Sequence, residues 1–519
     1  MSSLTIWDFI VIAAYFTVTA LIGWYAARGR TTSEDLFLAG RTLGPVAIGF
    51  SLFASNISSD TLVGLPGAAY STGISAANYE WMAGIVLMFT ALFVLPVLMR
   101  AKVTTMPELM ERRFDARLRK YLSVITLLLA ILLDTAGTLY AGGLIVTTFI
   151  PGLNLWLVCA VLALFTAVYT ALGGLRAVVW TDVMQAIVLL TGSALMTWII
   201  FGHFDHSWSN VREQLSPERL SLIRPLDDPG VPWLGLLTGL PIVGFYYWTM
   251  NQYVVQRILG ARNLQAAGRA SVFAALLKLL PIFIMTLPGA MAVPLLPHLD
   301  HPDQVFPTMV KTFTPTGLTG LILAGLIAAL MSTLSATLNS SATLLTLDFV
   351  KPARPHLDDY QLARWGRIFT FVVALIAALW GPMIQYFSGL WTYLQQVFAF
   401  VASPLVATFL MGLWVKQLGS SAALRGLACG HALSALLFVL IETGLLGLHF
   451  TIAGGVICAA TALFTWGWMK QLGSADRPGK DDQRITLIAK QGLERVPRDV
   501  LVGIVVVLIL TGVIVWFLR

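Results

Sequence analysis

The sequence predicts an all-α protein that crosses a membrane many times, and three observations support this fold class. Of the 519 residues, 57% are hydrophobic and only 11% are charged, whereas soluble proteins carry roughly 25% charged residues. The apolar residues form continuous runs long enough to cross a hydrocarbon core of roughly 30 Å as helices. These long runs exclude a β-barrel, because its strands alternate apolar and polar residues.

The apolar runs follow one another along the whole chain. We count about fourteen spans of membrane-crossing length. They lie at approximately residues 5–27, 45–72, 75–100, 120–148, 155–173, 177–203, 231–256, 267–296, 317–349, 365–385, 388–415, 421–446, 449–470 and 498–518.

Basic residues gather in the loops after spans 1, 3, 7, 9 and 13, where Arg113 and Arg257 belong to the basic sets. The alternate loops are poor in basic residues, and the longest of them, 203–230, balances its arginines with acidic residues. By the positive-inside rule, the basic loops are cytoplasmic and both termini lie outside. The net charge of +7 therefore reflects membrane topology and does not indicate nucleic-acid binding. We expect an integral, multi-pass protein of the plasma membrane, which in a bacterium is the inner membrane.

Span 2 contains residues that interrupt a helix. A polar run at 56–61 is followed by Gly64-Leu65-Pro66-Gly67. Backbone groups freed inside a membrane must find partners in the protein or along a watery cavity. A broken helix is therefore a candidate place for a small solute or ion, and the alternative is a plain loop between two shorter helices.

A second interruption is expected in span 7, at Gly239-Leu240-Pro241 and Gly244, just before the aromatic run Tyr246-Tyr247-Trp248. Spans 2 and 7 would each open a unit of about five spans, so the two breaks occupy corresponding positions. Because five is odd, consecutive units enter the membrane from opposite sides and are inverted. Matching breaks in two halves predict a transport site near the membrane midplane.

Four charged residues lie at membrane depth, where an ionised side chain costs at least about 2.5–3.5 kcal/mol. Glu80 and Lys278 would neutralise each other in a cavity and offer hydrogen bonds to hydroxyl groups. A buried ion pair without a ligand, or snorkelling to the interface, is the alternative. Asp182 lies near the predicted cytoplasmic edge, and the role of Asp134 is left open.

Span 9 is rich in hydroxyl groups. Ser332 and Thr333, with the backbone carbonyl of Ala329 one turn earlier, present three hard oxygen atoms of the kind that suits Na⁺. Unwound backbone at Ala54 and Ile57 in span 2 would supply more carbonyls. Packing of Ser and Thr between helices is the alternative reading.

Motifs for catalysis or ATP hydrolysis are absent from the sequence: there is no P-loop, no HExxH and no GxSxG between a strand and a helix. We therefore do not expect an enzyme, and uphill transport would draw on an ion gradient or on the membrane potential.

Four stretches together resemble the sodium/solute symporter family, and most closely its sodium–glucose branch. They are SLFASNIS…GLPGAAYSTGIS…YEW, GGLRAVVWTDVMQ, YYWTMNQYVVQRILGAR and AALMSTLSATLNSSATLLTLD. The resemblance implies a LeuT-type fold with two inverted five-helix repeats, here about 45–203 and 231–415. A peripheral helix at 5–27 and C-terminal helices at about 421–518 would complete a single transmembrane domain over 1–519.

The resemblance also implies two sets of site residues. The sodium site would use Ala54, Ile57, Ala329, Ser332 and Thr333. A second sodium site, found in some members, would use Asp182 and Ser335, although Ala336 lacks the hydroxyl that those members have next to it. The solute site would use Thr61, Tyr79, Glu80, Tyr247, Trp248, Lys278 and Gln396, with Gln395 as the neighbouring candidate.

The sequence departs from the sugar carriers at Thr61, Gly244 and Asp134, where relatives hold Gln, Asn and Asn. Our interpretation is a symporter in the lipid bilayer that couples Na⁺ entry to uptake of a small polar solute, with a hexose expected. Three alternatives stay open. One is a carrier of a carboxylate, amino acid or polyol, one is proton coupling through Asp182 or Asp134, and one is a sensor or channel-like protein. The sequence shows no signalling domain after its last span, which counts against the sensor.

Overall fold

The structure is a computed structural model that describes residues 4–27, 41–101, 103, 105–170, 175–476 and 496–519. These residues form helices and no β-sheet. Among them, ten helices are long and apolar enough to cross a membrane, and a bent helix pair would make eleven. The all-α, multi-spanning fold class is confirmed. The expected number of about fourteen spans is approximate, because some apolar runs contain only shorter helices.

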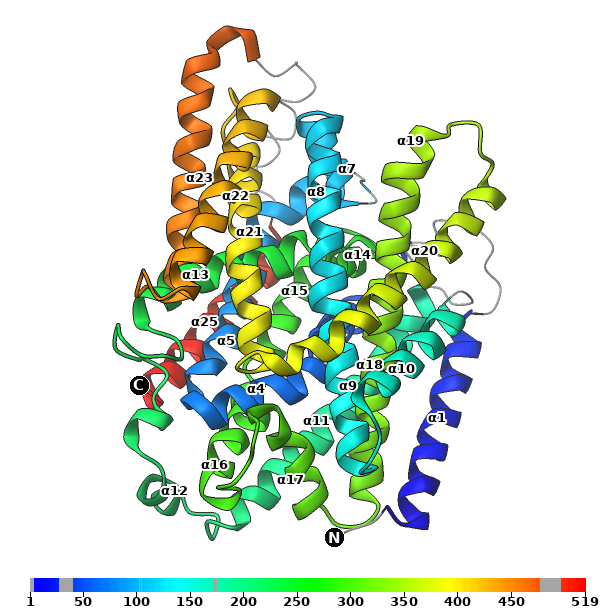
Figure 1. The fold of residues 1–519 in the computed structure, drawn as a ribbon, viewed down its shortest axis with the longest axis vertical. Coiled ribbons are helices and arrows are strands. Elements are labelled where there is room, and N and C mark those ends of the chain that lie inside the picture. The colour runs from blue at the N-terminus through cyan, green and yellow to red at the C-terminus, as the bar shows by residue number, and fades with distance from the viewer. Residues whose placement is uncertain (1–3, 28–40, 102, 104, 171–174, 477–495) are drawn as a thin grey trace.

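The first part of the chain, up to the end of span 6, contains α1 (Ile6–Ala27), α3 (Pro45–Asn56), α4 (Ser59–Thr72), η2 (Ile74–Ala77), α5 (Asn78–Phe89), η3 (Thr90–Val94), α6 (Leu95–Ala101), α7 (Met106–Arg113), α8 (Ala116–Leu129), η4 (Ala130–Thr135), α9 (Ala136–Phe149), α10 (Leu155–Thr170) and α11 (Leu175–Gly202). In Figure 1, α4 and α5 cross the middle of the molecule.

The second part, up to the end of span 11, contains α12 (Trp208–Gln214), η5 (Pro217–Leu220), α13 (Trp233–Phe245), η6 (Tyr246–Met250), α14 (Gln252–Leu259), α15 (Leu264–Leu277), η7 (Ile282–Thr286), α16 (Leu287–Leu295), η8 (Pro302–Gln304), α17 (Val305–Phe313), α18 (Leu318–Leu344), η9 (Leu345–Val350), α19 (Lys351–Ala353), α20 (Asp359–Trp380), η10 (Gly381–Tyr386) and α21 (Leu390–Trp414). The chain continues with α22 (Ser420–Glu442), α23 (Phe450–Leu472), η11 (Gly473–Asp476) and α25 (Arg498–Phe517).

Span 2 is broken inside the polar run that the sequence indicated. Helix α3 ends at Asn56, because Ile57 has φ −83° and ψ 69° and Ser58 is extended. Helix α4 then leaves at a bend of 59°. The Thr61 hydroxyl donates to the Asn56 carbonyl at 2.6 Å, so a backbone acceptor freed by the break finds a partner within the protein, as a membrane interior requires.

Span 7 is also interrupted, but the predicted position was wrong. Helix α13 runs through Pro241 without ending, and the chain leaves helical geometry only at Asn251, with φ −67° and ψ 122°. A π-helical turn, η6, precedes the break, and the Asn251 N–H donates to the Tyr246 carbonyl at 2.9 Å. A proline within a membrane helix is tolerated where neighbouring groups compensate for the hydrogen bond it removes.

Close helix contacts hold the broken segment in place. A Cβ atom added at Gly289 in α16 would lie 2.5 Å from the Pro66 carbonyl oxygen in α4, so only glycine allows this approach of the two backbones.

Helix α1 is attached to the rest of the molecule by a buried carboxylate. One Asp8 oxygen in α1 accepts hydrogen bonds from the N–H groups of Gly317 and Gly320 at 2.9 and 2.8 Å. This carboxylate fastens α1 to the start of α18, beside it in Figure 1.

Two arginines from the basic loop sets, Arg113 and Arg257, are buried, each about 2% exposed. Arg113 donates to the carbonyls of Gly412, Val415 and Leu418 at the end of α21, and Arg257 belongs to α14. Hydropathy alone misses them, because an arginine with enough carbonyl or carboxylate partners tolerates burial. Residues 28–40 and 477–495, which carry much of the predicted loop charge, lie outside the described residues.

Candidate solute and sodium sites

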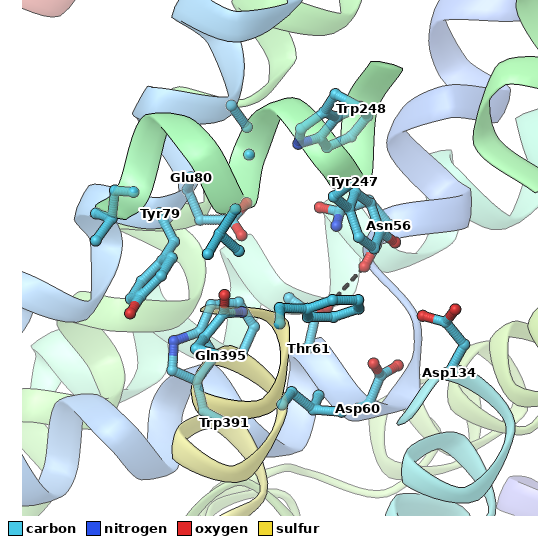
Figure 2. Close-up of a pocket in the computed structure, with 16 residues that line it drawn as sticks. Asn56, Asp60, Thr61, Tyr79, Glu80, Asp134, Tyr247, Trp248, Trp391 and Gln395 are labelled. Carbon is cyan, nitrogen blue, oxygen red and sulfur yellow. Dashed lines mark hydrogen bonds between the residues drawn. The ribbon is translucent and has the colours of Figure 1, made fainter. Parts of the chain in front are cut away.

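A cavity lies beside the break in span 2, between α4, α5, α13 with η6, and α21 (Figure 2). Its lining includes five of the predicted solute residues: Thr61, Tyr79, Glu80, Tyr247 and Trp248. Its volume of about 50 Å³ is room for a few water molecules. A solute the size of a sugar therefore enters only if some of the lining side chains move apart.

Glu80 and Lys278 form the ion pair that the sequence suggested. Glu80 lies in the first turn of α5 and Lys278 follows the last residue of α15, and both side chains are almost fully buried. The Lys278 ammonium also donates to the Asn56 side-chain carbonyl and lies 5.2 Å from the Trp248 ring centre. The pair is therefore tied to α3 and η6 and is neutral as a unit. Of the two partners, only Glu80 lines the cavity, whereas the Lys278 side chain is fully buried outside the lining.

Aromatic side chains close the cavity on two sides. Tyr79 and Trp391 meet edge to face, with ring centres 5.7 Å apart, and both also line a second cavity of about 270 Å³. On another side, Tyr247 packs edge to face on Phe398 and shares a hydroxyl–hydroxyl hydrogen bond of 2.5 Å with Tyr253. The first pair therefore separates the small cavity from a wider one, and Tyr247 forms another wall.

The structure distinguishes the two neighbouring glutamines of α21. Gln396, the predicted residue, turns away and donates to Glu442 in α22 at 2.5 Å. Gln395 lines both cavities, is about nine-tenths buried, and has no hydrogen-bond partner among the described residues. Consecutive residues of a helix point about 100° apart, so one position in register decides which side chain faces the cavity. The residue that we predicted, Gln396, therefore does not line the cavity, and the neighbouring candidate Gln395 does.

Two further carboxylates line the cavity, and our list of site residues did not include them. Asp60 lies in the first turn of α4, and Asp134 lies in the π-helical turn η4 of span 4. Asp134 accepts a hydrogen bond from the Asn251 amide at 3.4 Å, at the break in span 7. Their position in apolar spans was the available signal, since acidic residues at membrane depth mark functional sites.

The predicted sodium ligands belong to the broken span 2 and to α18, and both halves of span 2 contact α18. Ala54, Ile57, Ala329 and Thr333 are buried, and the Thr333 hydroxyl makes no hydrogen bond to any described residue. Ile57 is the residue at which the helix is interrupted. A free hydroxyl and non-helical backbone fit a hard cation that takes oxygen ligands.

Asp182 is held by several partners and is not an isolated carboxylate. It accepts hydrogen bonds from the Ser332 and Ser51 hydroxyls, each at 2.6 Å, and forms an ion pair with Arg257 at 3.3 Å. Ser335, the other predicted residue of a second sodium site, is partly buried and makes no hydrogen bond to Asp182 within the described structure. Sequence reasoning missed Arg257 because it stands near the end of an apolar run.

Comparisons with known proteins agree with this architecture. Residues 36–430 match the model of the sodium:solute symporter family. The chain is 34% identical over 450 residues to the sodium/glucose cotransporter of Vibrio parahaemolyticus, covering 81% of this chain and 82% of that protein. It is 32% identical over 475 residues to a sodium/mannose cotransporter of Bos taurus, covering 84% and 79%. It is 33% identical over 471 residues to sodium/myo-inositol cotransporter 2 of Mus musculus, covering 83% and 70%.

Solved structures show the same fold. A Na⁺-coupled sialic acid symporter in a substrate-bound outward-open state superposes with a TM-score of 0.75 at 22% identity, covering 90% of this chain and 98% of that one. The inward-facing structure of Mhp1 gives a TM-score of 0.60 at 17% identity, covering 89% and 98%. Both are LeuT-type transporters, so the predicted fold is confirmed. The chain is an integral multi-pass membrane protein and a sodium-coupled symporter rather than an enzyme, and it belongs to the sodium:solute symporter family.

Proposed function

We propose that this symporter imports a hexose-type solute and that the solute binds in the cavity beside the break in span 2. The observation that carries the proposal is the buried Glu80–Lys278 pair, held by Asn56 next to the cavity. Glu80 offers carboxylate acceptors to hydroxyl groups at the cavity, and Lys278 neutralises its charge, so the pair does not require a charged ligand. Relatives named for glucose, mannose and myo-inositol transport support a polyhydroxylated solute.

Different residues around the cavity would contact different parts of the solute. Trp248 offers an aromatic face on which the apolar face of a sugar ring packs. Gln395 supplies the amide that Thr61 and Gly244 do not, because both of these residues line the cavity with smaller groups. Gln396 has no part in this proposal, since its side chain is bonded to Glu442.

For sodium, we propose the carbonyls of Ala54, Ile57 and Ala329 with the hydroxyls of Ser332 and Thr333. Loss of this ion would free the broken span 2 to move away from α18 and open the cavity. Asp182 would orient Ser332 rather than bind a second ion, because Arg257 already balances its charge. We therefore expect one sodium per cycle, and Ser335 has no sodium-binding role in this proposal.

One sodium is sufficient to drive useful uptake. Entry of one charge through about 100 mV releases about 2.3 kcal/mol, and a tenfold sodium gradient adds about 1.4 kcal/mol. Together, about 3.7 kcal/mol sustain solute accumulation of several hundredfold.

For orientation, we propose that the wider cavity beyond Tyr79 and Trp391 faces outward and that Tyr247 lies on the cytoplasmic side. Besides helices α4 and α21, the lining of the wider cavity includes residues at the loops after spans 6, 8 and 10, among them Gly230, Asp303 and Gly389, and these loops are poor in basic residues. This places both termini outside, in a plasma membrane that is the inner membrane in a bacterium. The two inverted repeats would be residues 45–203 and 231–415 within one domain.

The test is sodium-dependent uptake of labelled hexoses, polyols and amino acids by proteoliposomes. Gln395→Ala should lower hexose uptake at least about tenfold, since a site built to hydrogen-bond a hydroxyl discriminates strongly. Gln396→Ala, one residue away on the same helix, is the matched control and should keep most of the uptake. Equal losses in the two variants, or uptake of amino acids alone, would contradict the hexose site.

The sodium site has its own test. Ser332→Ala combined with Thr333→Ala should abolish the sodium dependence of uptake, because two of the proposed oxygen ligands are removed. Ser335→Ala is the control and should retain it. Uptake in sodium-free buffer that responds to pH would show proton coupling instead.

A further inference from the structure

Two carboxylates in the solute cavity have no role in the proposal above. Asp60 and Asp134 come from α4 and η4, and Figure 2 shows both carboxyl groups at one side of the cavity, below Asn56 and Tyr247. Asp134 is only 6% exposed. Neither aspartate has an ion-pair partner in the described part of the chain, and their hydrogen-bond donors are neutral groups such as Ser58 and Asn251. This side of the cavity is therefore acidic.

The charge of the cavity makes these two residues unusual. Glu80 is balanced by Lys278 in a direct ion pair, so the remaining charged side chains that line the cavity are the two aspartates. An unpaired carboxylate at membrane depth is costly, and two that face one space repel each other. A cation bound between them removes both costs.

The opposite wall of the cavity carries polar groups that suit another part of the ligand. Gln395 is about nine-tenths buried, lines the cavity and has no hydrogen-bond partner among the described residues. The Tyr79 hydroxyl and the Trp391 indole N–H are buried donors that are likewise unpaired within the described residues. In Figure 2 these three side chains lie across the cavity from Asp60 and Asp134. Buried polar groups are normally hydrogen-bonded, so a complementary ligand carries oxygen acceptors at this end.

We propose that the preferred solute is an amino sugar with a free ammonium group, and that Asp60 and Asp134 determine this preference. The ammonium would donate to the two carboxylates, while ring hydroxyls meet Gln395 and the donors beside it. An ammonium has three N–H donors, which two carboxylates accept together. The inference rests on the proposed uptake of hexose-type solutes and specifies which member of that class is selected.

The experiment uses the full-length protein in proteoliposomes with a sodium gradient, and measures uptake of glucosamine, glucose and N-acetylglucosamine. We compare kcat/KM for glucosamine with kcat/KM for glucose as a ratio. Because hydrogen bonds to charged groups contribute strongly to binding, we expect this ratio to be at least about 10. N-acetylglucosamine lacks the charge, so its kcat/KM should be equal to or lower than that of glucose. Asp60→Asn and Asp134→Asn, which keep the side-chain shape, should each lower the ratio about tenfold. Asp499→Asn removes an exposed carboxylate that does not line the cavity and should leave the ratio unchanged.

The possible results test the amino-sugar inference and the proposed hexose uptake separately. A wild-type ratio near one, or an unchanged ratio in both cavity variants, overturns the amino-sugar inference while hexose uptake still stands. A change in the pH dependence of uptake without a change in the ratio would assign the pair to a proton and would also overturn it. If a variant fails to fold, competition of glucosamine against labelled glucose in the wild type decides the preference alone. Absence of sodium-dependent uptake of every sugar would instead refute the proposed function.

Discussion

Breaking the Glu80–Lys278 pair should cost more stability than most single substitutions. Lys278→Met removes the ammonium but keeps an unbranched side chain of similar length. It leaves Glu80 with 4% of its side chain exposed and no cation, and it also removes the donor to Asn56 and the contact with the Trp248 ring. Removal of one partner of a buried ion pair typically costs about 3–5 kcal/mol. We expect a loss of unfolding free energy in this range.

The double variant Glu80→Gln with Lys278→Met separates charge burial from packing. Since it contains no unpaired charge at this position, it should regain most of the lost stability. It should still fail to take up hexose, because the Glu80 carboxylate that accepts from the solute hydroxyls has been replaced. Unfolding in detergent micelles and uptake by proteoliposomes measure the two properties separately.

Two results would refute this reasoning. If Lys278→Met were as stable as the wild type, the ammonium would not be balancing the Glu80 charge in the folded protein. If the double variant were no more stable than Lys278→Met, the loss would come from packing and not from an unpaired carboxylate. Wild-type hexose uptake by the double variant would remove the pair from the solute site.

Three further predictions concern the framework around the site. Gly289→Ala should disrupt folding and abolish uptake, because its Cβ would lie 2.5 Å from the Pro66 carbonyl oxygen. Gly512→Ala is the control, because no atom lies within 4 Å of its Cβ. It should be tolerated in expression and thermal unfolding assays. Asp8→Ala should lower the free energy of unfolding by about 1–2 kcal/mol, because it removes the acceptor of two N–H groups at the start of α18. Burial raises the pKa of Asp303, in the loop after span 8, above its ordinary value of 3.8. Protonation of Asp303 therefore contributes most to stability below about pH 4, and this contribution is lost as the pH rises through the folded-state pKa. In thermal unfolding, the stability of the wild type relative to Asp303→Asn should decrease over that pH range. A constant difference between the two proteins would contradict this prediction.

The fold was predictable because a membrane constrains the backbone so strongly. Long apolar runs must become helices, and each expected run contains a helix in the structure. The break at residues 57–58 was also predictable, since a polar run in an apolar span needs partners. The break at Asn251 was not, because Gly239 and Pro241 are the stronger helix breakers by local preference. Tertiary contacts allow α13 to continue through both.

The site was predictable where its chemistry is rare in a membrane. Glu80 and Lys278 stand out as charges at membrane depth, and the structure pairs them. The choice between Gln395 and Gln396 depends on the rotation of α21, which no local pattern in a mostly apolar helix reveals. The partner of Asp182 depends on which helix ends come together. Arg257 follows Asp182 by 75 positions, and its sequence position alone suggests a loop.

The geometry of the break explains how the two proposed binding events can be coupled. Asn56 holds the Lys278 ammonium through its side chain and the Thr61 hydroxyl through its carbonyl. The next residue, Ile57, is proposed to bind sodium through its carbonyl, so one planar peptide unit joins the residue that holds the Glu80–Lys278 pair to the residue that would hold the ion. A sodium ion that fixes Ile57 also fixes Asn56, and so positions the Glu80–Lys278 pair for the solute. Because linkage is reciprocal, a solute that settles on this pair raises the affinity for sodium by the same factor, which is what obligatory symport requires.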